Sequence, residues 1–138
     1  MFKRIVCLFL VSVSLLFFFY ANKKPVLSDF SKTYEISIKN YSSAENLLTV
    51  SQAEFLAVYK VCGESVTLSI DDISESELIE KLHAIKVFEN EINGEKHTYY
   101  FSYKIKYGVT LNGRTVNLHI ALNGDKIKIG TPIIYGSF

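Results

Sequence analysis

Three Asn-Gly pairs constrain the fold of this chain more than any other feature of its sequence. They stand at positions 93–94, 112–113 and 123–124, between runs in which apolar and polar residues alternate. Asn and Gly both tolerate the positive φ angles of the tightest β-turns, so this dipeptide between alternating runs is a strong signal of an antiparallel hairpin. The pairs predict an antiparallel meander with strands at 87–92, 96–107, 115–122, 126–130 and 133–135.

A helix is predicted just before the meander. Ser74 and Glu77 form a capping box, in which each side chain satisfies a backbone N–H at the start of the helix. Glu77 can also pair with Lys81 one turn later. The acidic residues between 71 and 80 lie in or near the first helical turn, where the helix dipole favours them, so they require no metal ion. The apolar residues of the helix share one face, at Leu78, Leu82 and Ile85.

An earlier helix is predicted at 51–62. Ser51 and Glu54 form a second capping box, and Gly63 is well placed to end the helix. The competing interpretation is a strand through Val58 and Val61, which the agreement between the two capping signals disfavours. The apolar residues that would share one face of the helix are Phe55, Tyr59 and Cys62.

Two further strands are predicted at 34–39 and 65–70, where apolar and polar residues also alternate. Helices grouped before a run of neighbouring strands are typical of α+β domains. The sequence therefore predicts an α+β fold, in which an antiparallel β-meander sheet carries two helices packed on one face. By length, residues 34–138 form a single domain.

The N-terminal segment predicts export or membrane anchoring. Lys3 and Arg4 are followed by an uncharged, mostly apolar run at 5–21. Such a run is near the lower limit for crossing a bilayer and slightly long for a cleaved signal. We expect residues 1–21 to be a signal peptide or membrane anchor, 22–33 to be a tether, and the domain to lie outside the cell membrane. Cleavage near Ser28, which would give a secreted protein, is the alternative to a single-pass anchor.

Cysteine content excludes an intramolecular disulfide, and the charge balance disfavours one class of partner. The exported part contains only Cys62, so it cannot form an intramolecular disulfide. The whole chain has 15 Lys and Arg against 14 Asp and Glu; without Lys3 and Arg4 the balance is 13 against 14, or −1. Domains that bind nucleic acid in bulk are usually basic, so this balance argues against nucleic acid as the partner.

Alternation along the strands assigns side chains to two faces of the sheet. Along 96–107, the odd-numbered set from His97 to Tyr107 is expected to face the helices. Along 115–122, the even-numbered apolar residues are expected to do so. The opposite face is predicted to be exposed and basic, and to bind a partner. Its residues are Tyr100, Ser102, Lys104, Lys106, Asn117, His119, Lys126 and Lys128.

The sequence predicts a non-enzymatic protein without a metal or cofactor. His97 and His119 are expected on opposite faces of the sheet and His83 on a helix, so the three histidines do not converge as zinc ligands must. The sequence contains no phosphate-binding loop, nucleophile elbow or Cys-His signature. A cell-surface hydrolase is the alternative, and it would need polar groups that converge on one of the two strand histidines.

The C-terminal strands resemble those of a known family. The runs 116–122 (Val-Asn-Leu-His-Ile-Ala-Leu) and 129–134 (Ile-Gly-Thr-Pro-Ile-Ile) are similar to the closing strands of the YwmB family of spore-forming Firmicutes. The order of export segment, helix, strand, helix and meander also fits. The resemblance itself covers residues 50–135. It implies an exported α+β domain with a curved antiparallel sheet, of the kind called TATA-box-binding-like. It implies no established activity and no catalytic residues.

Taken together, these patterns predict an extracytoplasmic binding or assembly module, tethered to the membrane through residues 5–21 or secreted. Its expected partner is a protein or an anionic envelope polymer, which the exposed sheet face would bind. A nucleic-acid-binding domain, as the family's label suggests, is the alternative, although the export segment and the charge balance argue against it.

Overall fold

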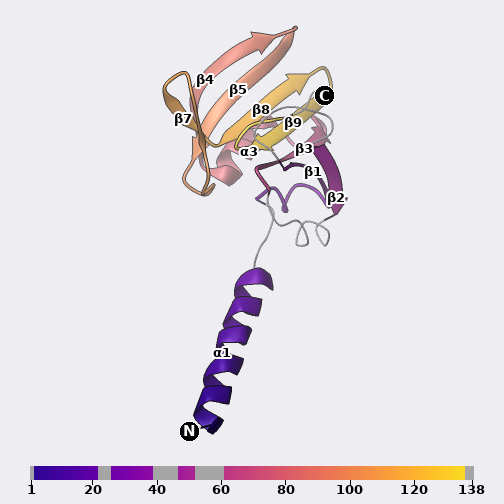
Figure 1. Cartoon of the computed structure of the whole chain (residues 1–138). Coiled ribbons are helices and arrows are strands. Elements are labelled where there is room, and N and C mark those ends of the chain that lie inside the picture. The colour runs from indigo at the N-terminus through magenta and orange to yellow at the C-terminus, as the bar shows by residue number, and fades with distance from the viewer. Residues whose placement is uncertain (1, 22–25, 39–46, 52–60, 136–138) are drawn as a thin grey trace.

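A computed structural model of the chain describes residues 2–21, 26–38, 47–51 and 61–135. The described residues form an α+β structure with a seven-stranded antiparallel sheet, which confirms the predicted α+β class and the antiparallel sheet. Of the two helices predicted to pack on this sheet, the later one is described, and most of the earlier one lies outside the described residues. Figure 1 shows this sheet as a curved layer, with the N-terminal helix projecting away from it.

The N-terminal helix α1 (Phe2–Ala21) coincides with the predicted signal or anchor segment. Wherever its side chains are described, at residues 5–17, they are exposed rather than packed on the domain. Of the helices within the described ranges, none is both long enough and apolar enough to cross a membrane.

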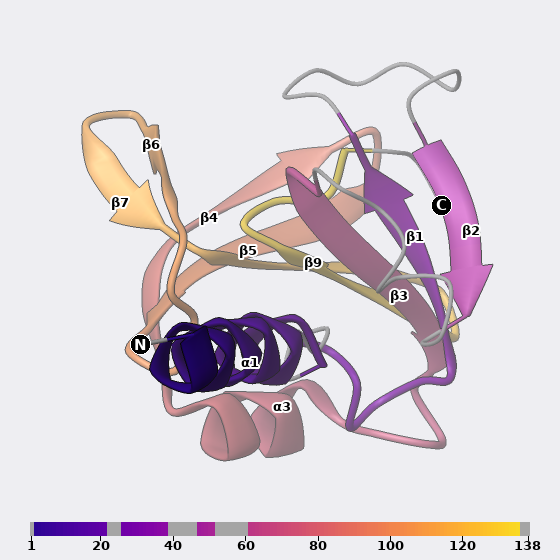
Figure 2. The same ribbon diagram turned by 60° about the horizontal axis from the view of Figure 1, so that its bottom comes forward.

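The seven strands pair in the order β2-β1-β3-β9-β8-β5-β4, and every neighbouring pair is antiparallel. The meander is therefore confirmed for β4, β5, β8 and β9, except that a separate hairpin of β6 and β7 is inserted between β5 and β8. Figure 2 shows this hairpin projecting as an arm from one end of the sheet. The strands are β1 (Thr33–Ser37), β2 (Leu47–Ser51), β3 (Gly63–Ser69), β4 (Ala84–Ile92), β5 (Glu95–Ser102), β6 (Val109–Leu111), β7 (Arg114–Val116), β8 (Leu118–Asn123) and β9 (Lys126–Thr131).

Two Asn-Gly pairs form the predicted two-residue turns. At 93–94 the φ angles are 53° and 82°, and at 112–113 they are 50° and 73°, as a type I′ turn requires at both central positions. At the third pair the turn lies one residue later, on Gly124 and Asp125, because Asn123 still pairs with Lys126. This shift changes the pairing by two residues, so the same side chains still face the core.

The helix α3 (Glu75–Leu82) begins at its predicted cap but ends earlier than predicted. Ile85, which was expected on its apolar face, lies in β4 and is exposed. The N–H of Glu77 donates to Oγ of Ser74 at 3.2 Å, and Glu77 forms an ion pair with Lys81 at 3.1 Å. His83 ends the helix in the left-handed conformation, with φ of 48°. Leu78 and Leu82 are the buried residues of α3, and they fix the helix to the sheet.

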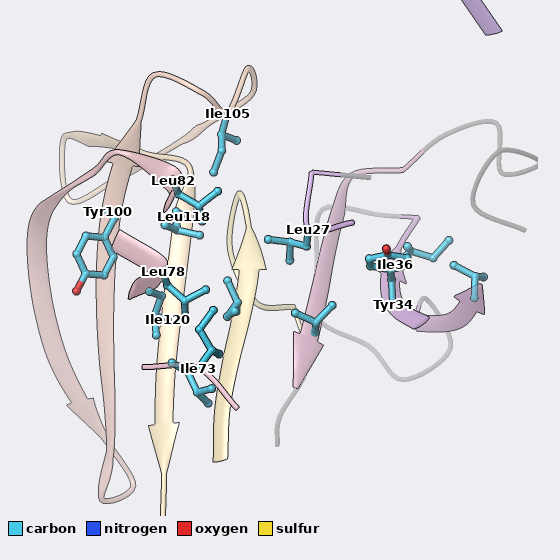
Figure 3. Close-up of a cluster of buried hydrophobic side chains, with 14 residues drawn as sticks. Leu27, Tyr34, Ile36, Ile73, Leu78, Leu82, Tyr100, Ile105, Leu118 and Ile120 are labelled. Carbon is cyan, nitrogen blue, oxygen red and sulfur yellow. The ribbon is translucent and has the colours of Figure 1, made fainter. Parts of the chain in front are cut away.

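The hydrophobic core lies between α3 and one face of the sheet, which we call the helix-covered face. It contains Tyr100, Leu118 and Ile120 beside Leu78 and Leu82 of the helix (Figure 3). On β8 the core-facing residues are the predicted Leu118, which pairs with Tyr100, and Ile120, which pairs with Thr98. On β9 they are the predicted Ile127 and Ile129.

Part of the predicted tether is folded. Leu27 is 0% exposed and lies in the core (Figure 3). Phe30 is partly buried and packs against this core. A turn holds this segment together, since the N–H of Phe30 donates to the carbonyl of Leu27 at 3.0 Å. Residues 26–33 of the predicted tether are therefore held on the domain, because the apolar side chains of Leu27 and Phe30 anchor a mostly polar stretch.

Two other predicted strands differ from the structure, and the predicted helix at 51–62 is not tested by it. Ser51 is the last residue of β2, and residues 52–60, which hold the rest of that helix, lie outside the described residues. The strand predicted at 96–107 ends at Ser102. Residues 133–135 are not a strand but a segment that folds back over the sheet, which we call the C-terminal strap (residues 132–135).

The outer edge of the sheet is protected where β4 is irregular. The β4–β5 register shifts between Lys86 and Phe88, which leaves a bulge at Val87. Arg114, from the arm, donates through Nη1 to the carbonyl oxygen of Val87 at 3.0 Å. A bulge and charged side chains are common devices against edge-to-edge pairing with another chain.

Candidate functional site

The side chains of β5 face the reverse of the predicted way. Tyr100 is 3% exposed and Ser102 is 0% exposed, both on the helix-covered face. The hydroxyl of Tyr100 donates to Oε1 of Glu75 at 2.7 Å, and the hydroxyl of Ser102 donates to the carbonyl of Leu82. Burial and the neighbouring carboxylate raise the pKa of Tyr100. These two residues hold α3 on the sheet and are not available to a partner.

Asn117 is also buried, and its side chain explains why β5 ends early. Its amide oxygen accepts from the N–H of Ser102 at 2.7 Å. Its amide nitrogen donates to the carbonyls of Ser102 and Ile105, at 2.7 and 2.8 Å. These three bonds replace the strand pairing that would otherwise continue. The chain therefore leaves the sheet at Ser102, and Lys104 and Lys106 lie on an exposed loop instead of on a strand.

The remaining predicted site residues are also separated. Lys126 is exposed beside a turn, whereas the side chain of Lys128 is 2% exposed and forms an ion pair with Glu35 at 2.7 Å. The predicted face is therefore wrong as a surface. Five of its eight residues are buried, and they divide between the two sides of the sheet: Tyr100, Ser102, Asn117, His119 and Lys128.

His97 and His119 lie on the same face of the sheet and contact each other, which contradicts the prediction that they lie on opposite faces. Nδ1 of His97 is 2.9 Å from Nε2 of His119. The reason is the register, because Tyr99 pairs with His119 and His97 pairs with Ala121. His97 and His119 are thus diagonal neighbours on adjacent strands, within reach of two long side chains.

The histidine pair continues a row of rings across three strands. Phe88 of β4 stacks on Tyr99 of β5, with ring centroids 4.5 Å apart. Tyr99 in turn stacks on His119 of β8 at 4.2 Å. Stacked rings at these separations add to the stability gained from burial. We call the row Phe88, Tyr99, His119 and His97 the ring ladder. It covers the sheet face opposite α3.

The hydrogen bonds of His119 define its protonation. The N–H of Ile134, in the C-terminal strap, donates to Nδ1 of His119 at 3.2 Å, so Nδ1 carries no proton. The single proton of the neutral ring therefore lies on Nε2 and is donated to Nδ1 of His97. Burial, with a smaller effect of His97, lowers the pKa of His119 to about 3. His119 therefore holds the strap as a neutral acceptor.

The ring ladder fits a role in holding the fold together better than a role in acid–base catalysis at neutral pH. A base with a pKa of about 3 binds protons too weakly to act at neutral pH, where general bases work best. Within the described ranges, neither imidazole forms a hydrogen bond with a Ser, Thr or Cys side chain. In that same part of the chain, no group of three or more His, Cys, Asp and Glu residues is placed to hold a metal ion.

A cavity of about 240 Å³ lies on another part of the domain. It opens between the start of β3, the exposed loop after β5 and the end of β9, and its wall is mainly apolar. We call it the Glu64 cavity, after the one carboxyl group among its residues. Those residues are Val26, Val61, Cys62, Gly63, Glu64, Ile105, Lys106, Tyr107, Thr131 and Pro132.

Glu64 is a buried acid on a core-facing position of β3. It is 5% exposed and lies opposite Thr131 in the β3–β9 register. Its Oε1 accepts from the N–H of Leu27 at 2.6 Å, and the N–H of Val26 is a second backbone donor to the carboxyl. Burial raises the pKa of Glu64 to about 7, an effect that the two N–H groups only partly offset.

A signal for Glu64 was present in the sequence. The alternation that places Val66 and Leu68 toward the core also places Glu64 there, at the same parity. A charged residue at a core position is rarely buried unless it is satisfied. The sequence did not predict Leu27 as the hydrogen-bond partner of Glu64, because a contact across 37 positions of the chain depends on tertiary structure.

Comparison with protein-family models, with curated proteins and with solved structures found no match for this chain. The resemblance to the YwmB family therefore stays a prediction.

Proposed function

We propose that this protein is a non-enzymatic extracytoplasmic binding module and that it binds its partner at the Glu64 cavity. The observation that carries the proposal is a cavity of about 240 Å³ with a mainly apolar wall and one buried carboxyl group. Concave apolar sites with few polar groups are the usual form of small-molecule sites. The sheet face predicted from the sequence offers no such site, because most of its residues are buried.

A variant with a filled cavity tests this function. Val61→Phe adds a ring where Val61 lines the cavity, so ligands should raise the melting temperature of the wild type more than that of the variant. The measurement is a thermal-shift screen of both full-length proteins against one panel of small molecules. Leu48→Phe is the control, because Leu48 is an exposed residue of β2 that does not line the cavity. Equal shifts for all compounds in both proteins would refute a site in the cavity.

We further propose that the domain is tethered by an uncleaved α1 rather than secreted. Cleavage near Ser28 would remove Leu27 from the core and would take both backbone donors from Glu64. A chain beginning after Ser28 would therefore be less stable than the full chain. The linker between Ala21 and Val26 spans at most about 17 Å, so a tethered domain would stay close to the bilayer.

The intact mass of the native protein, measured together with protease treatment of whole cells, tests this topology. A full-length, membrane-bound and protease-sensitive species is expected. A species trimmed near Ser28 and found in the medium would contradict the tether. A full-length species protected from protease would contradict the extracytoplasmic location.

A cell-surface hydrolase is the second candidate, because the two strand histidines do meet. It would require a hydrolytic activity that His97→Ala abolishes without unfolding the domain. Nucleic-acid binding, which the resemblance to a TATA-box-binding-like family suggests, would require an affinity for duplex DNA that falls steeply with salt.

A further inference from the structure

The Glu64 cavity contains a carboxyl group that no cation among the described residues balances. Among the described residues, none of the Lys, Arg and His side chains forms an ion pair with Glu64. Lys106 lines the same cavity, but its ammonium lies over the ring of Tyr107, 5.6 Å from the centroid. When Glu64 is ionised, two backbone N–H groups are its polar contacts.

The carboxylate can accept further hydrogen bonds from a ligand. An ionised carboxylate has about four acceptor positions, and the two backbone donors occupy about half of them. The rest of the cavity wall is mainly apolar, from residues such as Val26, Ile105 and Pro132. The volume of about 240 Å³ equals that of about eight water molecules, so an organic molecule of comparable size can replace them.

We propose that the Glu64 cavity binds a small apolar amine, whose ammonium group pairs with the carboxylate of Glu64 while its hydrocarbon part fills the apolar wall. The inference rests on the proposed function and names its ligand class. An ammonium has three donors and a positive charge, which matches the acceptor positions left on Glu64. A neutral ligand of the same shape would leave the carboxylate without a counter-ion, and an anion would be repelled.

Amine binding is coupled to the ionisation of Glu64. The pKa of this carboxyl is about 7 in the free protein, so binding of a cation should release a proton near neutral pH. Affinity for the amine should therefore rise between about pH 6 and pH 8. The other titratable groups that face Glu64 are Tyr34 on β1 and, around the cavity, Cys62, Lys106 and Tyr107.

Cys62 provides a reporter inside the cavity. It is a free, half-buried thiol that lines the site, and Cys7 on α1 is the second cysteine of the chain. In the full-length Cys7→Ser protein, a thiol-alkylating reagent reports on Cys62 alone. A ligand in the cavity should slow this alkylation, whatever its effect on overall stability.

The test compares 2-phenylethylamine with 2-phenylethanol, which has the same shape but no charge. Both are titrated into the full-length Cys7→Ser protein in a non-ionic detergent, by calorimetry and by the alkylation rate of Cys62. We expect the amine to bind at least about tenfold more tightly than the alcohol, and Glu64→Gln to remove this difference. Glu91→Gln, at an exposed position on the edge strand β4, is the matched control and should keep it.

The outcomes separate the inference from the proposed function. If the amine and the alcohol bind equally and both protect Cys62, the cavity is a binding site but its preference for amines is refuted. If neither compound binds or protects Cys62 at millimolar concentration, the amine site is refuted, and the screen against Val61→Phe decides the binding function separately. If Glu64→Gln does not fold, the pH dependence of amine binding to the protein with Glu64 intact serves as the test. The affinity for the amine should then fall from pH 8 to pH 5.5. A constant affinity over that range would refute pairing with Glu64.

Discussion

Two buried groups with opposite pKa shifts should give this domain an unusual dependence of stability on pH. Burial raises the pKa of Glu64 from 4.5 to about 7 and lowers that of His119 from 6.5 to about 3. One pKa unit corresponds to about 1.4 kcal/mol. The shift of Glu64 therefore corresponds to about 3 kcal/mol and that of His119 to about 5 kcal/mol.

The two contributions have opposite signs. Folded Glu64 binds protons more tightly than unfolded Glu64, so its contribution is complete below pH 4.5 and is lost as the pH rises to about 7. Folded His119 binds protons more weakly, so its contribution is complete above pH 6.5 and is lost as the pH falls to about 3. Between pH 4.5 and 6.5 the two slopes nearly cancel.

In the Glu64→Gln variant, the unfolding free energy should rise with pH through the contribution of His119, which Glu64 no longer cancels. Compared with the wild type, the variant should gain about 3 kcal/mol of unfolding free energy between pH 4.5 and pH 7, because the cost of ionising Glu64 is gone. The assay is urea unfolding of the full chain in a non-ionic detergent at half-unit steps of pH. Far-ultraviolet circular dichroism is the probe, because the chain contains no Trp.

The difference between the two pH profiles isolates Glu64, since all other groups are common to both proteins. Glu91→Gln controls for the loss of one carboxyl group from the exposed edge. Parallel profiles for the wild type and Glu64→Gln from pH 4.5 to pH 8 would show that Glu64 is not held in a desolvated site. The description of the cavity would then be wrong.

Three further substitutions test other parts of the structure. Leu27→Ala should lower the unfolding free energy by about 2–5 kcal/mol because it empties a buried site, whereas Val26→Ala, beside it but exposed, should change it little. Asn117→Ala should cost about 2–4 kcal/mol in the same unfolding assay, because it leaves buried backbone groups of Ser102 without partners. Gly130→Ala should displace the C-terminal strap, because the added Cβ would lie 2.7 Å from Cγ1 of Ile134. The carbon and nitrogen shifts of the His119 ring in NMR titrations should then report a higher pKa, and an unchanged titration would contradict the strap contact.

Local signals in the sequence predicted the local structure well. The Ser74 cap, the Glu77–Lys81 pair and two of the Asn-Gly turns form where the residues indicate, because each depends on atoms within four positions of one another. The facing of β8 and β9 was also predictable. A tight turn joins these strands, and it keeps their alternation in a fixed relation.

The facing of β5 depended on tertiary structure. Aromatic residues occupy both parities of this strand, so its composition favours neither face strongly. The chain between β5 and β8 runs through a loop and the arm, and no tight turn fixes the register of the two strands. A change of one residue in register exchanges every side chain between the faces. Packing of Tyr100 under α3 decides the register, and His97 and His119 meet as a result.

The sequence by itself determined the α+β class, the start of α3 and two of the Asn-Gly turns, because these follow from short-range patterns of polarity and backbone preference. Only the tertiary structure decided which residues form a site. The Glu64 cavity draws on segments from Val26 to Pro132, and the strap reaches His119 from the end of the chain. Such contacts depend on which surfaces are buried when the layers pack together, and neither alternation nor spacing along the chain contains that information.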